Sequence, residues 1–485
     1  MSEYFVGIDV GSQGVRVVLL DESGTIISSA EKKWLLHNVG GIEHEQDPYQ
    51  WWEAICTCLQ ELSQKNSFTN ISRLSLVATS GTLLLLDSSY RPLHPALMWN
   101  DKRAIKEAEE ANKMFQTEGP DLGLEIRPTF TLAKALWMKR HKPEIWKQTK
   151  YVVSAGDWLL TQLTGNSPIT DFTNALKTGA DLINLSWPKT LSNLGINEVL
   201  LPPIVAPGTP LGTISSEVSK LTNLPTTCVV LSGVTDAMGA QIASGAVDEG
   251  QWVTTIGTGL SIKGNTIEKI SGIDSGLYSH RAWNGNWSVS ATSHCGGDSL
   301  HKKFPNINFE NYSSSAKEIQ FSSYLVLPLA TTGEYFPFTH PKAIGFEKGD
   351  SNNSYDLFLG YLEGIAFIER LAMETISNLA DVSGPQISMG GGASNSFWLE
   401  IRAETLGRPT VKPVETSSAF GAGIIALAGD SKLISATAKK VVKYHPTVVP
   451  KESMIEKREV RYKEFLQELV DLDYLQPQSK TVAAK

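Results

Sequence analysis

Hydrophobic residues at the start of the chain fall into short runs that polar turns interrupt. Residues 5–10 and 15–21 are mostly apolar, and a Gly-Ser-Gln-Gly turn at 11–14 separates them. Runs of this length, bounded by glycine-containing turns, predict β-strands joined by a hairpin. A third run begins at Ile26, after another turn. The chain is therefore expected to open with a meander of strands.

The period of the hydrophobic pattern then changes to that of a helix. Asp47 and Pro48 are typical of an N-cap and a first helical residue, and an apolar stripe of helical spacing begins at Trp51. Two more apolar runs, at 74–79 and 83–87, are expected to continue the first sheet as a hairpin. Strands that come first as a meander and then alternate with helices indicate an α/β fold.

The second half of the chain repeats the plan of strand, glycine-rich turn and strand. A glycine-rich turn at 257–259 separates two strand-like runs, and a long amphipathic helix and a small-residue helix follow later. The shared plan predicts two domains of one architecture, at 1–228 and 229–475, and a polar tail at 476–485. The expected elements of the second half are strands at 252–256, 260–263 and 387–389 and helices at 355–379 and 419–428.

Composition sets limits on the partners of the protein. The 485 residues supply enough apolar material for two cores, and the net charge of −8 argues against nucleic acid and anionic membranes as partners. No apolar run reaches the ~20 residues of a membrane span. The first residues lack a secretory signal. We expect a cytoplasmic protein that is a monomer or a homodimer.

The four cysteines carry no visible chemistry of their own. They are too few for a disulfide framework in so long a chain, and none has the spacing of a zinc site. Core packing is the preferred interpretation of all four, which are Cys56, Cys58, Cys228 and Cys295.

The first glycine-rich turn carries candidate chemistry. Asp9 lies near the end of the first strand, and the glycines and hydroxyl that follow leave backbone N–H groups able to approach phosphate. Because a bare carboxylate repels phosphate, Asp9 fits there only with Mg²⁺ or a metal-bound water between them. The alternative is a plain hairpin turn in which Asp9 and Ser12 cap backbone groups. The residues alone favour neither interpretation.

Two glycine-rich segments of the second half are candidates for a nucleotide site. The turn at 257–259 is similar in kind to the first turn, and two such turns could clamp a triphosphate. Neither is a Walker A loop, since the chain has no Gly-x-x-x-x-Gly-Lys-Ser/Thr motif. Three glycines at 390–392 follow a strand and leave room for a flat ligand such as adenine or a ribose. A structural turn explains them equally well.

Asp236 follows an apolar strand at 228–231 and precedes a small-residue helix at 237–244. An acid at this place lies near a helix N-terminus, where negative charge is stabilised. The same place suits a plain N-cap. Judged without its context, the cap is the preferred role of Asp236.

Taken together, these segments resemble the FGGY carbohydrate kinases of the actin-like ATPase superfamily over nearly the whole chain. Each motif is weak by itself, but their common order is specific. The matching motifs are Gly7-Ile8-Asp9-Val10-Gly11-Ser12, Glu45-Gln46-Asp47-Pro48 with Trp51 and Trp52, the segment from Leu97 to Arg103, Lys134-Ala135-Leu136-Trp137, Asp236, Gly257-Thr258-Gly259, Glu363-Gly364, Gly390-Gly391-Gly392-Ala393 with Asn395, and Ala419-Phe420-Gly421-Ala422.

The resemblance implies an ATP-dependent enzyme with two ribonuclease-H-like domains, each with a mixed five-stranded sheet, and a cleft between them. It implies Mg²⁺ at Asp9, and it makes Asp236 the catalytic base that orients the sugar hydroxyl and takes its proton. The implied phosphate and ATP residues are Gly11, Ser12, Gln13, Gly257, Thr258, Gly259, Gly391, Gly392, Ala393 and Asn395, and the implied sugar residues are Thr79, Ser80, Asn100, Asp101 and Asp236.

Departures from the family pattern bear on the identity of the sugar. Xylulose kinases usually carry a Met-His pair where this chain has a Thr-Ser-Gly-Thr turn at 79–82, and an Asn where it has Ala237. Both features are more similar to the ribulose-kinase-like branch. The sequence therefore favours D-ribulose as the acceptor, with D-xylulose or another small ketose or polyol as the alternative.

Two functions outside sugar phosphorylation remain as alternatives. An actin-like ATPase would share both phosphate turns but would leave the segment at 99–103 unexplained. A catalytically silent sugar-binding protein would keep that segment and lose Asp9 or Asp236, yet both acids are present. A kinase with a ketose and ATP as its small-molecule partners is therefore preferred.

Overall fold

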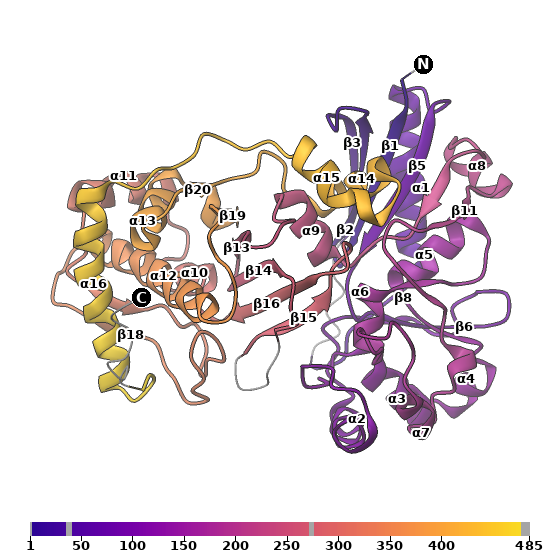
Figure 1. Ribbon diagram of the computed structural model, residues 1–485, viewed down its shortest axis with the longest axis horizontal. Helices are drawn as coiled ribbons and strands as arrows, with labels where there is room; N and C mark the ends of the chain where they lie inside the picture. Colours follow the sequence, from indigo (N-terminus) through magenta and orange to yellow (C-terminus); the bar gives the residue numbers. More distant parts are fainter. Residues whose placement is uncertain (1, 35–40, 271–275, 477–485) are drawn as a thin grey trace. The chain divides into compact units, whose positions relative to one another are not determined.

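The computed structural model describes residues 2–34, 41–270 and 276–476, and the chain divides into two compact units (Figure 1). The predicted boundary between 228 and 229 lies inside unit 1, because the strand that follows it pairs with the first sheet. Most of the predicted tail, 477–485, lies outside the described residues. Unit 1 comprises Met1–Val247, His280–Asn286 and Glu415–Val442, and unit 2 comprises Asp248–Ser279, Trp287–Val414 and Lys443–Lys485.

Unit 1 is built on a six-stranded mixed sheet of order β11-β12-β5-β1-β2-β3. The predicted meander is confirmed, since β1 pairs antiparallel with β2, and β2 with β3. β5 lies parallel to both β1 and β12, so these three strands end at the same edge of the sheet. The strands are β1 (Tyr4–Gly11), β2 (Gly14–Asp21), β3 (Ile26–Lys33), β5 (Ile71–Ala78), β11 (Pro210–Thr213) and β12 (Val229–Leu231).

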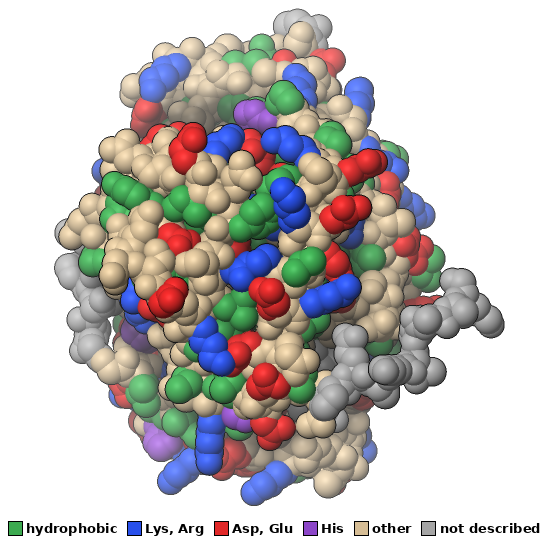
Figure 2. Space-filling model, turned by 90° about the vertical axis from the view of Figure 1, so that its left-hand side faces the viewer, with side chains coloured by type: hydrophobic (Ala, Val, Ile, Leu, Met, Phe, Trp, Pro, Cys, Tyr) green, Lys and Arg blue, Asp and Glu red, His purple; other side chains and the backbone are tan. Residues whose placement is uncertain are grey.

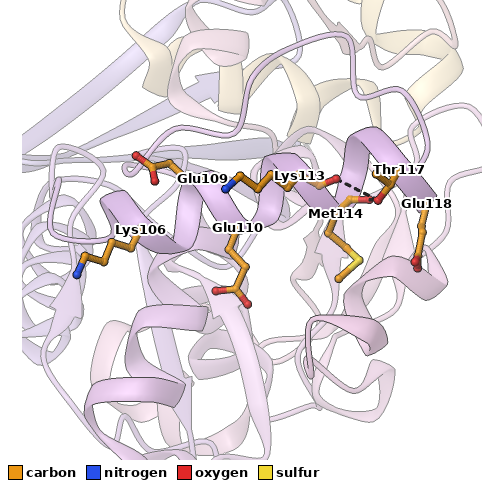
Figure 3. A pocket seen from close by; sticks show the side chains of 7 residues that line it. All are labelled: Lys106, Glu109, Glu110, Lys113, Met114, Thr117 and Glu118. Atoms are coloured by element: carbon orange, nitrogen blue, oxygen red, sulfur yellow. Dashed lines mark hydrogen bonds between the residues drawn. The ribbon is translucent and has the colours of Figure 1, made fainter.

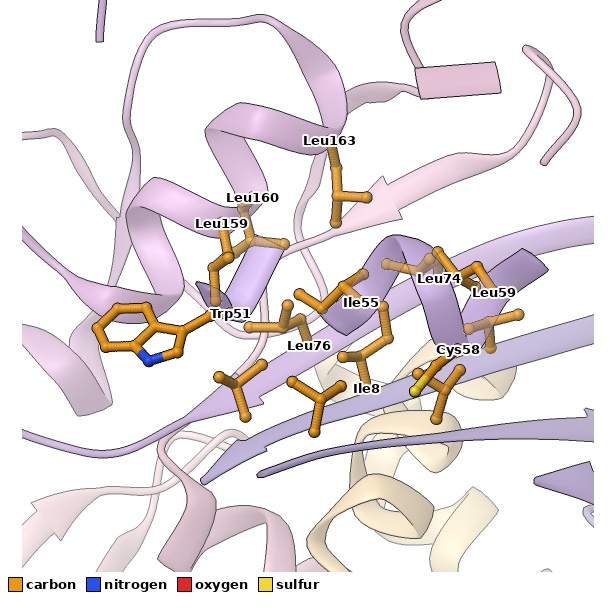
Figure 4. Close-up of a cluster of buried hydrophobic side chains, with 14 of the residues drawn as sticks. Ile8, Trp51, Ile55, Cys58, Leu59, Leu74, Leu76, Leu159, Leu160 and Leu163 are labelled. Atoms are coloured by element: carbon orange, nitrogen blue, oxygen red, sulfur yellow. The ribbon is translucent and has the colours of Figure 1, made fainter. Parts of the chain in front are cut away.

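Alternating side chains of β1 and β5 build one core on each face of this sheet. On one face, Ile8 and Leu76 pack against α1 (Pro48–Lys65) and α5 (Ala155–Thr164), as Figure 4 shows. On the other face, Phe5 and neighbouring residues meet the helices α9 (Asp236–Ser244), α14 (Ser418–Ala428) and α15 (Ser431–Val441). The last two helices lie far along the chain from the strands that they cover (Figure 1).

The predicted hairpin at 83–87 does not extend the main sheet. This run forms β6 (Leu83–Leu86), which pairs with β7 and β8 in a separate four-stranded sheet of order β4-β7-β6-β8. A turn with Gly81 at φ +87° separates β6 from β5. Hydrophobicity identified the strand correctly, but periodicity does not say which partner a strand chooses. The other strands of this sheet are β4 (Glu45–Gln46), β7 (Ala96–Leu97) and β8 (Tyr151–Ser154).

Unit 2 contains a second six-stranded mixed sheet, of order β15-β16-β14-β13-β19-β20. The predicted strand, turn and strand are present as β13 and β14, and β19 lies parallel to β13. Each main sheet thus has six strands among the described residues, one more than expected. The strands are β13 (Trp252–Ile256), β14 (Leu260–Thr266), β15 (Tyr278–Arg281), β16 (Trp287–Ser293), β19 (Gln386–Gly390) and β20 (Thr410–Val411).

Helices complete both units, and the long amphipathic helix and the small-residue helix predicted for the second half are both present, as α12 (Ser354–Ser377) and α14. Within the described residues, no single helix is both long and apolar enough to cross a membrane. Figure 2 shows a face on which basic and acidic side chains are interspersed. The remaining α-helices are α2 (Ile105–Glu118), α3 (Thr131–His141), α4 (Pro143–Gln148), α6 (Phe172–Ala175), α7 (Lys189–Asn193), α8 (Ser216–Thr222), α10 (Gly297–Lys303), α11 (Phe309–Ile319), α13 (Ser396–Leu406) and α16 (Glu452–Asp471).

Candidate active site

Three predicted site segments of unit 1 meet at the edge where β1, β5 and β12 end. Val10 of β1 is paired with Ala78, the last residue of β5. Ala78 in turn forms a parallel bridge with Thr235. This register places Asp9, the turn that begins at Thr79 and the start of α9 next to one another. The topology therefore gathers the predicted metal, sugar and catalytic residues of unit 1.

Asp9 is half-buried, and one oxygen of its carboxylate lacks a partner. Its Oδ1 is buried and accepts no hydrogen bond. Burial, the larger cause, and the negative charge of Asp236 together raise the pKa of Asp9 to about 7, against the opposing effect of Arg16. Within the described residues, no three His, Cys, Asp or Glu side chains form a ready metal cluster. An orphaned carboxylate oxygen beside a second carboxylate nevertheless fits Mg²⁺ held by Asp9 directly or through water.

Asp236 is not the N-cap of α9. The hydroxyl of Thr235 accepts from the backbone N–H of Met238 and supplies the cap. Asp236 is the first residue of the helix, is half-buried, and accepts from the N–H of Ala237 at 2.7 Å. The backbone N–H of Thr235 donates to the hydroxyl of Thr173 at 3.0 Å, which fixes the start of the helix. Asp236 was a candidate for both the helix cap and the catalytic base, and the structure assigns the cap to the neighbouring Thr235.

The turn at 79–82 presents hydroxyl groups beside Asp236. Thr79 and Thr82 share a hydrogen bond of 2.8 Å between their side-chain oxygens. The Oγ of Ser80 is buried and has no hydrogen-bond partner. Lys134 is fully buried, and its ammonium donates to the carbonyls of Gly81, Leu97 and Met98. Lys134 thereby ties this turn to the segment that contains the other predicted sugar residues.

That segment holds Asn100 half-buried and Asp101 completely buried. The carboxylate of Asp101 accepts from the guanidinium of Arg103 at 2.7 Å and from the backbone N–H of His44 at 2.7 Å. These partners give Asp101 a positioning role, and direct sugar binding by Asp101 stays a prediction. Trp99 is 45% exposed although it is large and apolar. Hydrophobic patterning does not predict that Trp99 is exposed.

The turn between β1 and β2 is held by hydrogen bonds from the motif that contains Gln46. The carbonyl of Ser12 accepts from the side-chain amide of Gln46 at 2.9 Å and from the indole of Trp34 at 3.0 Å. The indole of Trp51 donates to Gln46 at 2.8 Å. These contacts leave the half-buried Gly11 and the exposed Gln13 at the outer side of the turn. The role of Gln46 in shaping this turn was missed by the sequence analysis.

Two glycine-rich segments of unit 2 also share one edge of their sheet. Ile256, which ends β13, is paired with Gly390, which ends β19. Gly257 and Thr258 follow the first strand and are exposed. A Cβ at Gly257 would meet no atom within 4 Å, so the backbone there is open to a ligand. This edge is therefore accessible to a phosphate or a nucleotide.

The segment after β19 is held by a buried ion pair. Gly391 and the buried Gly392 and Ala393 form a 3-10 turn, η4 (Gly391–Ala393). Arg402 of α13 pairs with Glu369 of α12, both fully buried, and donates to Ser388 and to the carbonyl of Gly392. Sequence reasoning did not identify Arg402, because the partners that define its role come from three other elements.

Asn395 is used as a structural cap in this structure. Its side-chain oxygen accepts from the N–H of Trp398 at 2.9 Å, and its amide donates to Ser313 at 2.9 Å. Asn395 is 8% exposed, so an additional contact with adenosine stays a prediction. The pattern of Asn followed by an apolar helix would have predicted this cap from the sequence.

A surface hollow on α2 lies apart from these residues. It is about 410 Å³ in volume, and none of the predicted site residues lines it (Figure 3). Its lining is Lys106, Glu109, Glu110, Lys113, Met114, Thr117 and Glu118. Because all seven belong to one exposed helix, the hollow does not add to the candidate active site.

Comparison with known proteins identifies the class to which this fold and these sites belong. Residues 4–243 match the model of the N-terminal domain of the FGGY family of carbohydrate kinases. Residues 286–429 match the model of the C-terminal domain of the same family. The chain belongs to the FGGY family of carbohydrate kinases. It is accordingly an ATP-dependent sugar phosphotransferase, and the predictions of fold class and enzyme class are confirmed.

Individual relatives cover most of the chain at low identity. The xylulose kinase of Escherichia coli (strain K12) is 26% identical over 419 residues, which are 83% of this chain and 85% of that protein. The xylulose kinase of Staphylococcus xylosus is 25% identical over 473 residues, 93% and 96% of the two chains. The crystal structure of a "xyloylose kinase" from Brucella ovis superposes with a TM-score of 0.87 at 22% identity, over 97% and 99% of the two chains.

A further solved structure shows that the fold does not fix the sugar. The gluconate kinase from Lactobacillus acidophilus superposes with a TM-score of 0.86 at 20% identity, over 97% of this chain and 98% of that chain. Proteins named for different acceptors are thus almost equally similar to this chain in fold. The acceptor has to be argued from the site itself.

Proposed function

We propose that this kinase transfers the γ-phosphoryl group of ATP to a hydroxyl of a ketopentose, with D-xylulose as the first candidate. The observation that carries the proposal is the place of Asp236. It begins α9 beside the turn at 79–82, and the capping task that would otherwise explain it belongs to Thr235. A carboxylate so placed lies beside the turn where a sugar hydroxyl is expected.

The preference for D-ribulose that the sequence suggested loses support. It rested on the absence of a Met-His pair at the position of the turn 79–82 and on Ala237. Several of the relatives that cover more than four-fifths of this chain are named xylulose kinases. We therefore rank D-xylulose above D-ribulose. Discrimination between them rests on C3, the carbon at which the two sugars differ in configuration.

Asp236 would orient the attacking hydroxyl and finally accept its proton. Phosphoryl transfer passes through a loose transition state, so alignment contributes more than strong basicity. The N-terminus of α9 stabilises negative charge on Asp236 before the reaction. The hydrogen bond from Thr235 to Thr173 holds the first turn of the helix, and thereby the carboxylate, in place.

The glycine-rich turns would bind phosphate and nucleotide through their backbone N–H groups. In unit 1 these groups belong to Gly11, Ser12 and Gln13, whose turn is held by Gln46. In unit 2 the corresponding residues are Gly257, Thr258 and Gly259, with η4 as the expected adenosine contact. Mg²⁺ would be held by Asp9, and when bound it would neutralise charge on the phosphates.

Steady-state kinetics on a panel of acceptors tests the proposal. ATP turnover would be measured with D-xylulose, D-ribulose, glycerol and D-gluconate, and without any acceptor. We expect the highest kcat/KM for D-xylulose and turnover near background without a sugar. A tenfold or larger preference for any other acceptor contradicts the substrate assignment, and sugar-independent hydrolysis as fast as the best coupled rate contradicts a role in sugar phosphorylation.

A further inference from the structure

Lys177 lies beside the candidate base, and no motif pointed to it. It belongs to η1 (Leu176–Thr178), a 3-10 turn that directly follows α6. Its ammonium nitrogen donates to the carbonyl of Ser80 at 3.3 Å. The backbone of the turn at 79–82 passes close to the Lys177 side chain, because a Cβ at Gly81 would lie 2.9 Å from its Cδ. Lys177 therefore packs against the turn expected to bind the sugar.

The ammonium of Lys177 has unused hydrogen-bonding capacity. A lysine ammonium has three N–H donors and no acceptor. Within the described part of the chain, the Ser80 carbonyl is its one hydrogen-bond partner, and no carboxylate lies within 4.0 Å. The ring of Phe130, at 5.8 Å, offers a weak cation–π contact. Two of the three donors thus remain available to a ligand.

The surroundings of Lys177 are partly buried and carry opposing charges. Burial lowers the pKa of Lys177, while the negative charge of Asp236 raises it and the positive charge of Arg127 lowers it. Arg127 is exposed, and Lys177 is half-buried. Asp236 is therefore the acidic group close enough to act on Lys177, although it does not form a direct ion pair with it. Lys177 and Asp236 thus carry opposite charges beside the same turn, at 79–82.

A second polar group next to Lys177 is also unsatisfied. The hydroxyl of Ser80 is buried and has no hydrogen-bond partner, although the carbonyl of the same residue binds Lys177. Buried polar atoms in native proteins nearly always have a partner. The hydroxyl of Ser80 and the ammonium of Lys177 are neighbours, and both can form further hydrogen bonds. Because they lie beside the carboxylate of Asp236, they indicate a ligand that carries several oxygens.

We propose that Lys177 is a specificity-determining residue that donates a hydrogen bond to an oxygen of the acceptor sugar while Asp236 holds the reacting hydroxyl. The inference rests on the proposed function, since it assumes a sugar bound at the turn 79–82. Because an ammonium only donates, it selects an oxygen that accepts, whereas the hydroxyl of Ser80 both donates and accepts. The pair of contacts would fix which face of the sugar chain lies toward Asp236.

The test compares Lys177→Met with Lys220→Met. Lys220 lies exposed in the last turn of α8, so its replacement controls for the loss of one surface charge. The sugar Kd would be measured by titration calorimetry with the acceptor that the wild-type enzyme prefers, and KM would be measured for sugar and for ATP. For Lys177→Met we expect the sugar Kd to rise roughly 10- to 100-fold and the ATP KM to change less than about twofold.

Rescue separates sugar binding from a purely structural role. Lys177→Arg keeps a charged donor on a long side chain, and we expect it to recover part of the lost sugar affinity. A melting temperature is recorded for every variant. The proposal is overturned if Lys177→Met binds the sugar as tightly as Lys220→Met does, or if the sugar and ATP constants rise together. A folded Lys177→Met with weak sugar binding and normal ATP binding supports it.

The proposed function and this inference fail in different ways. If the wild-type enzyme phosphorylates no ketopentose, the proposed function is wrong. The calorimetric comparison then uses the acceptor that the panel identifies, and it decides the role of Lys177 independently. If D-xylulose is a good substrate and the two lysine variants are equivalent, the proposed function stands and the role of Lys177 is rejected.

Discussion

At the start of α9, two adjacent polar residues have different partners. Thr235 is the N-cap and accepts from the N–H of Met238, whereas Asp236 is the first helical residue, accepts from the N–H of Ala237 and lies at the edge where the strands of unit 1 end. A sequence pattern of strand, acid and helix does not distinguish these tasks, because either residue can cap a helix. The structure assigns the cap to Thr235, and the role of Asp236 as the base stays a prediction.

Variants of Asp236 and Thr235 are expected to have contrasting effects, the first on activity and the second on stability. Asp236→Asn should lower kcat by about 10²–10⁴-fold, the usual contribution of a positioned base, and leave the ATP KM nearly unchanged. Thr235→Ala should lower the free energy of unfolding by about 0.5–2 kcal/mol through loss of the cap, with most of the activity kept. Steady-state kinetics and urea unfolding measure the two effects. An Asp236→Asn enzyme with a tenth of wild-type kcat would remove Asp236 from the role of base.

A single glycine in unit 2 allows binding and folding to be separated. Gly257→Ala adds a Cβ into open space, so stability should not change, whereas a phosphate that approaches this backbone would be displaced. We expect the KM for ATP to rise roughly 10-fold, the loss of about one charge-assisted hydrogen bond. The comparison is Gly259→Ala, whose Cβ would lie 2.6 Å from the carbonyl of Ser293 and should destabilise the fold. Unchanged ATP binding in folded Gly257→Ala would argue against a phosphate turn here.

At the scale of elements, several residues of the sequence motifs hold one element of the fold against another. Lys134 joins the turn at 79–82 to the segment after β7, and Gln46 holds the turn between β1 and β2. Glu363 of the long helix α12 forms a buried ion pair with Arg458 of α16. The resemblance drew attention to the motifs that contain these residues, but the tasks of the residues depend on partners from other elements. Spacing along the chain carries no information about such partners.

The elements themselves were largely predictable, and the pairing of strands was only partly so. Alternating apolar runs defined the strands of the opening meander, and the helix beginning at Pro48 was read from its cap. The run at 83–86 was recognised as a strand but assigned to the wrong sheet. A fully apolar strand, buried on both faces, has no alternation from which its neighbours could be inferred.

The buried ion pair between Arg402 and Glu369, next to η4, leads to a prediction about the stability of unit 2. Arg402→Met would leave the carboxylate of Glu369 buried without a partner, and a broken buried pair costs about 3–5 kcal/mol. We expect a corresponding fall in the free energy of unfolding, measured by denaturant titration. The double replacement Arg402→Met with Glu369→Leu removes both charges and should recover much of the loss. Equal instability of the single and double variants would mean that lost packing, and not the unpaired charge, dominates.

At the scale of the whole chain, unit 1 is discontinuous in sequence. Its sheet comes from the first 247 residues, and the helices α14 and α15 that cover one face come from 415–442. The fit is close, because a Cβ at Gly7 would overlap the carbonyl of Ala419 in α14. A prediction of two consecutive domains could not anticipate this return, since hydrophobic patterning describes each segment only locally.

A fragment of residues 1–247 should therefore be incompletely folded. It lacks the cover for Phe5, Val18 and Leu20, all of which are buried in the whole protein. We expect the fragment to aggregate or to bind a hydrophobic dye strongly, and a fusion that appends 415–442 through a flexible linker to be more soluble. Size-exclusion chromatography of the two forms makes the comparison. A monomeric, protease-resistant fragment would show that the returning helices are dispensable.

The late arrival of α14 also imposes an order on biosynthesis. A ribosome adds about 5–20 residues per second, so the apolar face of the first sheet waits roughly 10–40 s between the emergence of residue 247 and that of residue 442. During this interval the nascent chain presents an uncovered apolar face of the sheet to other polypeptides. Its yield in a cell should thus depend on chaperones that bind the ribosome exit, and slowing translation after residue 247 should lengthen the exposure and lower the yield.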